Sequence, residues 1–261
     1  MLKFIKKIII LFITKNGYML KKVGEYDVLR PIQPDNILRK HLATIDANTM
    51  VTTEGLISLY DQVRYLEERE IKGDFVECGV WKGGCIGLMA SANQRYGKEP
   101  RMLHLFDSFE GIPEPDVSVD GDLALKQTHD WSDGGMSGKM RALPGFYDTL
   151  GGVGTLQDNK ELLEDIICYP KEKINYHVGW FNETLPLNKI ESIALLRLDG
   201  DWYESTKTCL EYLVSKVVKN GFIIIDDYGT YDGCKKAVDE YFSNQFYFHR
   251  VNQDIIYIVK N

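Results

Sequence analysis

This sequence of 261 residues lacks the patterns that identify many enzymes at sight. It has no CxxC pair, no GxGxxG fingerprint and no readable Ser-His-Asp or Cys-His arrangement, which are the usual signals of a zinc or redox centre, a dinucleotide site and a catalytic triad. The five cysteines lie in or beside apolar segments without metal spacing: Cys78, Cys85, Cys168, Cys209 and Cys234. An odd number of such thiols favours the reduced state, so we expect a cytoplasmic protein.

Basic residues are too few for a phosphate-binding track. The chain has 31 Lys and Arg against 38 Asp and Glu, a formal net charge of −7. Binding to nucleic acid needs a basic surface, so no nucleic-acid partner is expected. The remaining composition, 44% hydrophobic and 26% charged, is that of an ordinary soluble enzyme with one large α/β domain.

The chain also lacks a hydrophobic run long enough to span a bilayer, which takes about 20 residues. The apolar start at residues 1–13 is shorter and is not followed by a small-residue cleavage site. Two interpretations stay open, a basic amphipathic helix on a membrane surface or a helix that packs on the domain or on a second subunit. We favour packing. We therefore expect residues 1–45 to form an N-terminal helical extension, with peripheral membrane contact through residues 1–14 as the alternative, and a homo-oligomer.

What is present is a regular alternation of short apolar runs with helical patterns. A strand at 74–79, a glycine loop, a helix at 85–96 and a strand at 102–107 make a βαβ unit with a parallel sheet. Three more strands follow, at 174–178 and ending at Asp199 and Asp226, and then a hairpin of two strands at 247–251 and 254–260. This order predicts an α/β, Rossmann-like class I methyltransferase fold over residues 46–261. It has a mostly parallel seven-stranded sheet, an antiparallel C-terminal hairpin strand and helices on both faces.

The periodicity stops between about residues 110 and 154, where proline, glycine and aspartate cluster. So long a segment without periodicity is typical of a lid or binding loop, and its aromatic residues could close over a substrate. A surface insertion with short helices of its own explains the pattern equally well. His129 in this segment could serve as a general base only if the segment closes over the site.

A glycine loop connects the first strand of the βαβ unit to its helix: Glu77-Cys-Gly79-Val80-Trp81-Lys-Gly83-Gly84. Glycine lets the backbone approach a ligand closely, and the helix amino terminus favours electron-rich groups. The spacing suits a ligand without a pyrophosphate, such as S-adenosylmethionine. Asp107, at the end of the next strand, stands where an acid often binds ribose hydroxyls, although capping of the turn with Ser108 is a competing role. Together these features favour a nucleoside-bearing cofactor.

Carboxylates follow two further apolar strands, at Asp199, Asp201, Asp226 and Asp227. Such groups are costly to bury unless a positive charge meets them, and Mg²⁺ or Ca²⁺ takes carboxylate ligands. Asp226 and Asp227 can share one ion only if the chain leaves the strand between them, which Tyr228-Gly229 permits. Asp201-x-x-Glu204 resembles a capping box, so Asp199 is the better metal ligand. Arg197, inside the same strand, is expected to be a paired structural cation.

These segments are similar to the macrocin O-methyltransferase family, which methylates sugar hydroxyls. The matching segments are 73–84, 106–113, 179–186, 196–206 and 221–228, with Thr49-Met50 upstream. The resemblance implies S-adenosylmethionine as cofactor, Mg²⁺ held by Asp199, Asp226 and Asp227, a sugar-containing acceptor, and Asp199 or Asp201 as the base. It also implies that the following residues bind the cofactor: Thr49, Met50, Glu77, Gly79, Val80, Trp81, Gly83, Gly84, Asp107, Ser108 and Trp180.

Three alternatives to this function remain at the level of sequence. The same chemistry could act on a phenolic hydroxyl, the sheet could serve a metal-dependent oxidoreductase that binds NAD through Asp107, or the chain could be a non-catalytic binding module. The missing GxGxxG argues against NAD, and the intact set of strand-end acids argues against a module without activity. The segment from Pro115 to Gly154 is longer and richer in glycine than the family pattern. The acceptor therefore need not be a macrolide sugar.

Overall fold

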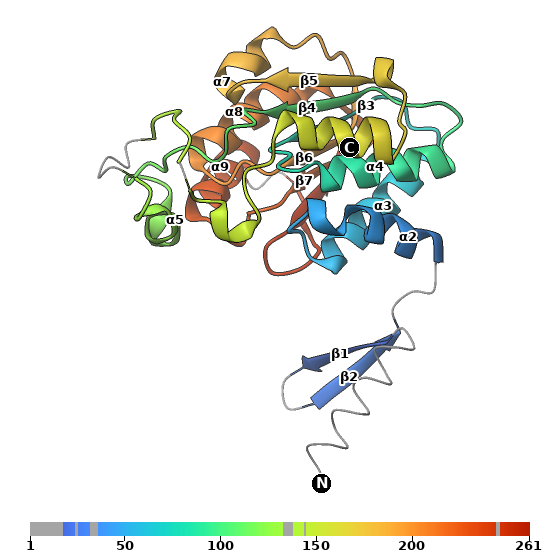
Figure 1. Cartoon of the computed structure of the whole chain (residues 1–261), viewed down its shortest axis with the longest axis horizontal. Coiled ribbons are helices and arrows are strands. Elements are labelled where there is room, and N and C mark those ends of the chain that lie inside the picture. The colour runs from blue at the N-terminus through green and yellow to red at the C-terminus, as the bar shows by residue number, and fades with distance from the viewer. Residues whose placement is uncertain (1–17, 24–25, 32–35, 133–137, 144, 244–245) are drawn as a thin grey trace. The chain divides into compact units, whose positions relative to one another are not determined.

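The computed structural model describes residues 18–23, 26–31, 36–132, 138–143, 145–243 and 246–261. The chain divides into two compact units between Ala43 and Thr44. The larger unit is built around a seven-stranded sheet in the order β5-β4-β3-β6-β7-β9-β8 (Figure 1). Its strands are β3 Asp74–Cys78, β4 Leu103–Asp107, β5 Ile174–Val178, β6 Ile193–Leu198, β7 Val217–Ile225, β8 His249–Arg250 and β9 Ile256–Val259.

The direction of the strands confirms the predicted fold class. β3, β4, β5, β6 and β7 pair in parallel, whereas β9 lies antiparallel to both β7 and β8. The hairpin link between the last two strands places β9 inside the sheet and leaves β8 at its edge. Because the first five strands are parallel, their carboxyl ends meet along one edge, which is where open α/β sheets bind ligands.

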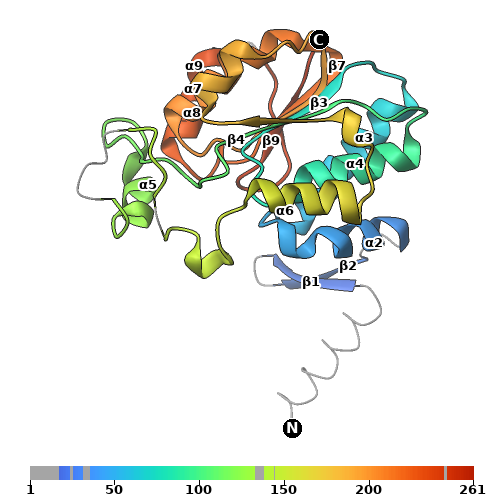
Figure 2. The ribbon, with the colours of Figure 1, turned by 45° about the horizontal axis from the view of Figure 1, so that its top comes forward.

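Helices cover both faces of this sheet, with α3 and α4 on one side and α7, α8 and α9 on the other (Figure 2). The helices of the larger unit are α3 Thr53–Glu68, α4 Gly84–Tyr96, α5 Gly121–Thr128, α6 Leu156–Lys160 with the π-helical continuation Glu161–Ile166, α7 Phe181–Thr184, α8 Tyr203–Leu213 and α9 Asp232–Phe242. Short 3-10 turns lie at Asp46–Asn48, Asp148–Leu150, Lys171–Lys173, Leu185–Leu187 and Val214–Lys216.

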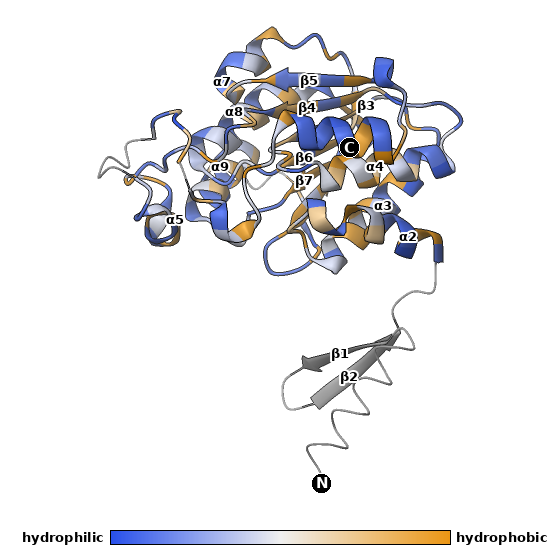
Figure 3. Cartoon of the chain, in the orientation of Figure 1, coloured by the Kyte–Doolittle hydropathy of each residue, from blue (hydrophilic) through white to orange (hydrophobic). Residues whose placement is uncertain are grey.

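The core lies where alternate strand residues meet the helices, and hydrophobic residues concentrate on these strands (Figure 3). Val76, Leu196 and Ile223 share one cluster with Leu210 of α8 and Val238 of α9. Burial on both faces explains why these strands are almost continuously apolar in sequence. At about 25 cal/mol per Å² of buried apolar surface, such a cluster supplies the dominant stabilisation. The sheet is therefore a firm platform for the groups at its edge.

The insertion after β4 folds against the larger unit. It contains α5 and the 3-10 turn Asp148–Leu150, and Ile112, Ala124 and Leu143 form a small hydrophobic cluster with Trp202. Because Trp202 directly precedes α8, the cluster fixes the insertion beside the carboxyl edge of the sheet. The insertion thus combines both expected features, short helices of its own and a position next to the acid-bearing loops.

The N-terminal unit differs from the helical extension that the sequence predicted. Within the described residues, β1 Tyr18–Val23 and β2 Tyr26–Pro31 form an antiparallel hairpin, and α2 Asn36–Ile45 is helical. The two strand runs are separated by two residues in sequence, one of them a glycine, which is a recognised hairpin spacing. The proposed contact through residues 1–14 lies outside the described residues. Within the described part of the chain, no helix is long and apolar enough to cross a membrane.

Candidate active site

The backbone of the glycine loop between β3 and α4 lies in close contact with the residue that follows β6, Asp199. Gly79 has φ +80°, and a Cβ at this position would lie 1.9 Å from the carbonyl oxygen of Asp199. Trp81, at φ +44°, is held by its own carbonyl, which accepts from Asn159 Nδ2 at 2.7 Å. The loop backbone thus touches the segment that carries Asp199, which explains the glycine at position 79.

Gly79→Ala is expected to lower the free energy of unfolding by at least about 2 kcal/mol, because alanine disfavours this positive φ and its methyl group would overlap the Asp199 carbonyl. Urea unfolding measures the loss. Gly152→Ala is the matched control: Gly152 has φ +91°, yet nothing lies within 4 Å of the added methyl position. Equal losses in the two variants would show that backbone strain alone accounts for the effect.

Asp107, at the end of β4, organises the same loop. Its Oδ2 accepts from the backbone N–H groups of Val80 at 2.8 Å and Trp81 at 3.3 Å, and its Oδ1 accepts from Phe109 N at 2.7 Å. Removal from water raises the pKa of this carboxyl above its ordinary value despite these three donors. Ser108 donates to the Gly111 carbonyl within the next turn. Asp107 and Ser108 therefore stabilise the turn after β4, and ribose binding by Asp107 stays a prediction.

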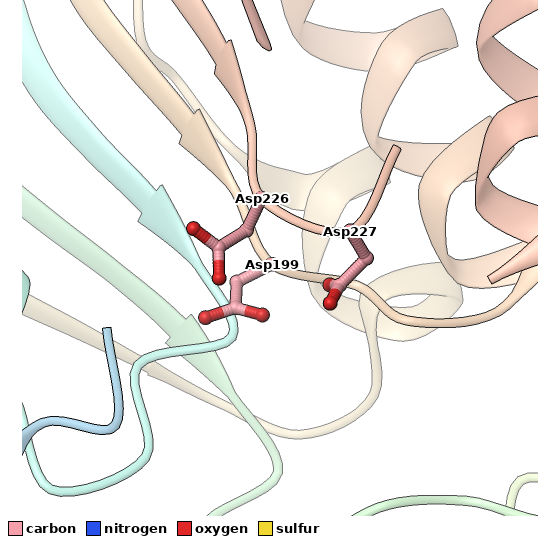
Figure 4. A group of neighbouring side chains, drawn as sticks. All are labelled: Asp199, Asp226 and Asp227. Atoms are coloured by element: carbon pink, nitrogen blue, oxygen red, sulfur yellow. The ribbon is translucent and has the colours of Figure 1, made fainter. Parts of the chain in front are cut away.

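Three aspartates converge where β6 and β7 end. Asp199 follows Leu198, the last residue of β6, and Asp226 and Asp227 follow Ile225, the last residue of β7. One carboxylate oxygen from each residue lies within 4.8 Å of the others (Figure 4). Because the chain leaves β7 before Asp226, neighbouring side chains are not forced to opposite faces of the sheet. The predicted grouping of these three residues is confirmed, and we call it the acid rim.

Arg197 lies beneath the acid rim and is almost completely buried, with 3% exposure. Strand register places it opposite Glu77 of β3, and its Nη1 donates to Glu77 Oε1 at 2.7 Å. The same nitrogen donates to Asp199 Oδ2 at 2.9 Å, and Nη2 lies 2.8 Å from Asp226 Oδ1. Arg197 is thus the paired structural cation that the sequence predicted. Glu77 directs Oε1 to Arg197, and its contact with the cofactor stays a prediction.

The acid rim carries more negative charge than Arg197 can balance. Of the described residues lining the adjoining cavity, Arg197 is the single cation among five carboxylates: Glu77, Asp199, Asp201, Asp226 and Asp227. Burial raises the pKa of Asp226 to about 6, and burial followed by repulsion from Asp201 and Asp199 raises the pKa of Asp227 well above its ordinary range. Asp227 Oδ2 is buried and has no hydrogen-bond partner among the described residues. Hard oxygen donors with uncompensated charge fit a divalent cation such as Mg²⁺.

Asp201 does not cap α8, and the expected capping box is absent. The residue has φ +55°, Trp202 is the N-cap residue, and no side chain of the box bonds the helix amino terminus. The acceptor comes from elsewhere, because Tyr203 N donates to Asp120 Oδ1 at 2.7 Å. Burial and the neighbouring Asp199 raise the pKa of Asp201 well above its ordinary value. Asp201 therefore faces the site as a carboxyl group with high proton affinity.

Two adjoining cavities open at this edge of the sheet. The first, of about 120 Å³, is lined by the glycine loop, Asp107, Ser108 and Trp180. The second, of about 410 Å³, contains the acid rim and is walled by aromatic residues of the insertion, Trp131 and Phe146. Six residues line both cavities: Met50, Trp81, Ile112, Tyr147, Asp199 and Asp201. The shared wall means that a ligand in one cavity can meet a ligand in the other.

Most of the predicted site residues lie at these cavities. Met50, Gly79, Trp81, Asp107, Ser108 and Trp180 line the first, and Thr49, Met50, Glu77, Val80, Trp81 and Gly84 line the second. Gly83 instead turns toward Asn159, whose Oδ1 would lie 2.5 Å from an added Cβ. His129 is exposed and interacts with Asp130 outside the lining of both cavities. His104 and His177 bond to each other, Nδ1 to Nε2, at 3.0 Å.

Two residues at the site, Tyr231 and Asp120, have no clear signal in the sequence. Tyr231 lines the second cavity, and its ring packs on Trp202 with centroids 4.9 Å apart. The one feature of the sequence that points to Tyr231 is its position four residues after Asp227. Asp120 bonds α8 from a segment 83 residues earlier in the chain. No local pattern reports a contact of that separation.

The strand order, the glycine loop before α4 and the carboxyl group at the end of β4 together define a class I methyltransferase. The chain belongs to the macrocin-O-methyltransferase (TylF) family, whose profile matches residues 27–139 and 167–259. It is therefore an S-adenosylmethionine-dependent O-methyltransferase, and the oxidoreductase and non-catalytic alternatives are set aside.

Relatives of known activity are similar over most of the chain. Demethyldecarbamoylnovobiocin O-methyltransferase of Streptomyces niveus is 34% identical, over 75% of this chain and 68% of its own. A tetracenomycin 4'-O-methyltransferase of Streptomyces olivaceus, whose name specifies a dimethoxy-rhamnosyl substrate, is 33% identical over 75% and 67%. The solved structure of the O-methyltransferase NovP has 30% identity and a TM-score of 0.66, and the match covers 82% of each chain.

Proposed function

We propose that this protein methylates a sugar hydroxyl of a glycosylated acceptor, with S-adenosylmethionine in the first cavity, the acceptor in the second and Mg²⁺ at the acid rim. The observation that carries the proposal is the convergence of Asp199, Asp226 and Asp227 beside the wall that both cavities share. The substrate named for the Streptomyces olivaceus relative supports a sugar acceptor. The acceptor itself is open to test.

The residues around the first cavity have the chemistry to hold the donor. Trp81 and Trp180 offer flat apolar faces, and the amino terminus of α4 directs backbone N–H groups toward the glycine loop. Asp107 keeps that loop in place through Val80 and Trp81, and a carboxylate has lone pairs beyond the three bonds it makes here. We propose that this remaining capacity serves the ribose hydroxyls. Glu77 and Gly83 belong to the glycine loop itself, and the Thr49 hydroxyl lies 3.9 Å from Cys85 Sγ in the first turn of α4. We keep these three among the proposed cofactor contacts.

When bound, S-adenosylmethionine supplies an electrophilic methyl group and Mg²⁺ supplies stabilisation of developing alkoxide charge, an effect of several kcal/mol. The chain supplies alignment and a base. Asp201 lines both cavities, so its carboxylate can reach a hydroxyl placed beside the methyl donor, and we assign it as the proton acceptor. Asp199 is less suited because its Oδ2 accepts from Arg197. Trp131 and Phe146 exclude water from the second cavity and offer ring faces to a sugar.

Methyl transfer should be measured with S-adenosylmethionine and two acceptor panels, one of neutral glycosides and one of catechols. We expect product methylated on a sugar hydroxyl, loss of turnover with EDTA, and recovery on addition of Mg²⁺. Mass spectrometry of the cleaved sugar locates the methyl group. Preferred methylation of the catechols would favour the phenolic alternative, and unchanged turnover with EDTA would refute the metal site.

Three further features stay predictions about the whole chain. They are a cytoplasmic location, assembly into a homo-oligomer, and the choice between packing and peripheral membrane contact for residues 1–14. Flotation of the full chain with liposomes of anionic lipid tests the last of these. Comparison of the full chain with a variant that begins after residue 17, by light scattering, tests whether the start of the chain contributes to assembly.

A further inference from the structure

The amino terminus of α8 depends on a residue of the insertion. A helix begins with backbone N–H groups that have no partner in the helix, and an acceptor side chain normally satisfies one of them. Neither Trp202, the N-cap residue, nor Asp201 supplies it. Asp120 supplies it from the segment that leads into α5, through the bond from Tyr203 N to Oδ1. The cap of α8 therefore joins the insertion to the loop that carries Asp199 and Asp201.

Asp120 is built into this position. Its side chain is buried, with 2% of the residue exposed, and its Oδ2 accepts from Asp116 N at 2.6 Å. The start of α9 also makes room for it, because a Cβ on Gly233 would lie 2.0 Å from Asp120 Oδ1. One carboxylate thus occupies the space between the beginnings of α8 and α9. These two helices follow the two loops that carry the acid rim.

Two other bonds connect the insertion to the same loops. Trp202 Nε1 donates to the Pro113 carbonyl at 2.8 Å, and Tyr231 Oη donates to Gln127 Oε1 at 2.7 Å. Trp202 directly follows Asp201, and Tyr231 lies four residues after Asp227. The insertion is therefore attached to both acid-bearing loops, and a change in its position is transmitted to them.

We propose that Asp120 is a positioning residue for methyl transfer: it caps α8 in place of Asp201 and thereby leaves Asp201 free to line both cavities. The role rests on the proposed function, in which Asp201 accepts the proton. Without Asp120, the free N–H of Tyr203 would compete for the Asp201 carboxylate, and the local capping box read from the sequence could form. Asp201 would then turn from the site toward the helix.

Asp120→Ala is expected to lower kcat at least about thirtyfold, since proton transfer by a positioned group contributes on the order of 10²–10⁴. The KM for S-adenosylmethionine should change less than kcat, because the glycine loop, Asp107 and Trp180, which also line the first cavity, lie outside α8 and its cap. Asp120→Asn should keep more of the activity than Asp120→Ala, because its amide oxygen can still accept from Tyr203 N, although its amide nitrogen cannot accept from Asp116 N as Oδ2 does. Asp116→Ala is the matched control, since among the described residues that side chain bonds Ser118 of its own loop.

A double-mutant cycle separates positioning from general loss of stability. If Asp120 acts through Asp201, the double variant Asp120→Ala/Asp201→Asn should be no slower than Asp201→Asn alone. Multiplied losses in the double variant would overturn the proposal. So would equal losses in Asp120→Asn and Asp120→Ala, or a kcat for Asp120→Ala within twofold of the wild type.

Hydrogen exchange tests the cap without any acceptor. In Asp120→Ala, the backbone amides of residues 199–206 should exchange faster than in the wild type, whereas those of α4 should exchange at the wild-type rate. In the control Asp116→Ala, the amides of residues 199–206 should also exchange at the wild-type rate. Unchanged exchange at 199–206 would overturn the proposal even if sugar methylation is confirmed. Absence of methylation by the wild type on every glycoside would instead contradict the proposed function, and the exchange result would still decide whether Asp120 caps α8.

Discussion

Asp226→Asn is expected to lower kcat by on the order of 10³ while the affinity for S-adenosylmethionine stays within a few fold of the wild type. The variant removes one charged oxygen donor from the acid rim, and the alkoxide stabilisation that depends on the cation is worth several kcal/mol, at about 1.4 kcal/mol per tenfold. The first cavity is spared because Asp226 lines only the second of the two. Initial rates with saturating donor, together with calorimetric titration of S-adenosylhomocysteine, measure the two effects separately.

Asp74→Asn is a suitable control for this variant. Asp74 begins β3, at the opposite edge of the sheet from the acid rim, and its carboxylate meets His104 at 3.2 Å. Asparagine can keep that bond, so we expect activity close to the wild type. A kcat for Asp226→Asn within tenfold of the wild type would contradict a metal-assisted reaction. Rates that respond to Mg²⁺ in Asp74→Asn but not in Asp226→Asn would support it.

Arg197→Met is expected to lower the free energy of unfolding by about 3–5 kcal/mol, which is the range for removing one partner of a buried ion pair. The change leaves Glu77, 1% exposed, and the rim residues Asp199 and Asp226 without their cation. Methionine matches the length of the arginine stem, so loss of packing contributes little. Urea unfolding in the presence of EDTA measures the loss without help from a divalent cation.

Charge compensation separates this effect from simple repacking. Glu77 is buried with 1% exposure, and this burial, partly offset by Arg197, raises the pKa of its carboxyl to about 8, so its charged form depends on the cation. The double variant Glu77→Gln/Arg197→Met should therefore recover part of the stability lost in Arg197→Met. Added Mg²⁺ should stabilise Arg197→Met, because the cation binds the remaining rim carboxylates. A loss below about 1 kcal/mol in EDTA would show that the rim does not depend on Arg197.

Much of the fold was predictable because the strands are buried on both faces. The apolar run that ends at Leu198 and the one that ends at Ile225 have a single interpretation as buried strands, and the acids after them mark the sheet edge. The same pattern predicts Asp199, Asp226 and Asp227 at one edge of the sheet, where they lie together. Arg197 could be recognised as structural because a cation inside such a strand must be paired.

The cap of α8 and the structure of the N-terminal segment could not be predicted, because each local pattern is compatible with two structures. Asp201-x-x-Glu204 is a valid capping signal. Nothing in these four residues shows that Asp120, from the insertion, caps the amino terminus of α8. The sequence predicts a helical extension over residues 1–45, yet Tyr18–Val23 and Tyr26–Pro31 pair as strands. Strand pairing and helix formation draw on the same apolar residues there, and pairing is decided by the contact between the strands.

Sequence by itself determined the order of the strands, the edge of the sheet that carries the site and the identity of the acid rim. These three features follow from hydrophobic periodicity, which is a property of a few neighbouring residues and can therefore be recognised in the sequence. Three features are decided by the tertiary structure alone. Glu77 pairs with Arg197, the insertion packs at the starts of α8 and α9, and Asp201 lines the two cavities. The physical reason is that the partner of a buried charge or a free helix terminus is chosen by proximity in space, which local sequence does not encode.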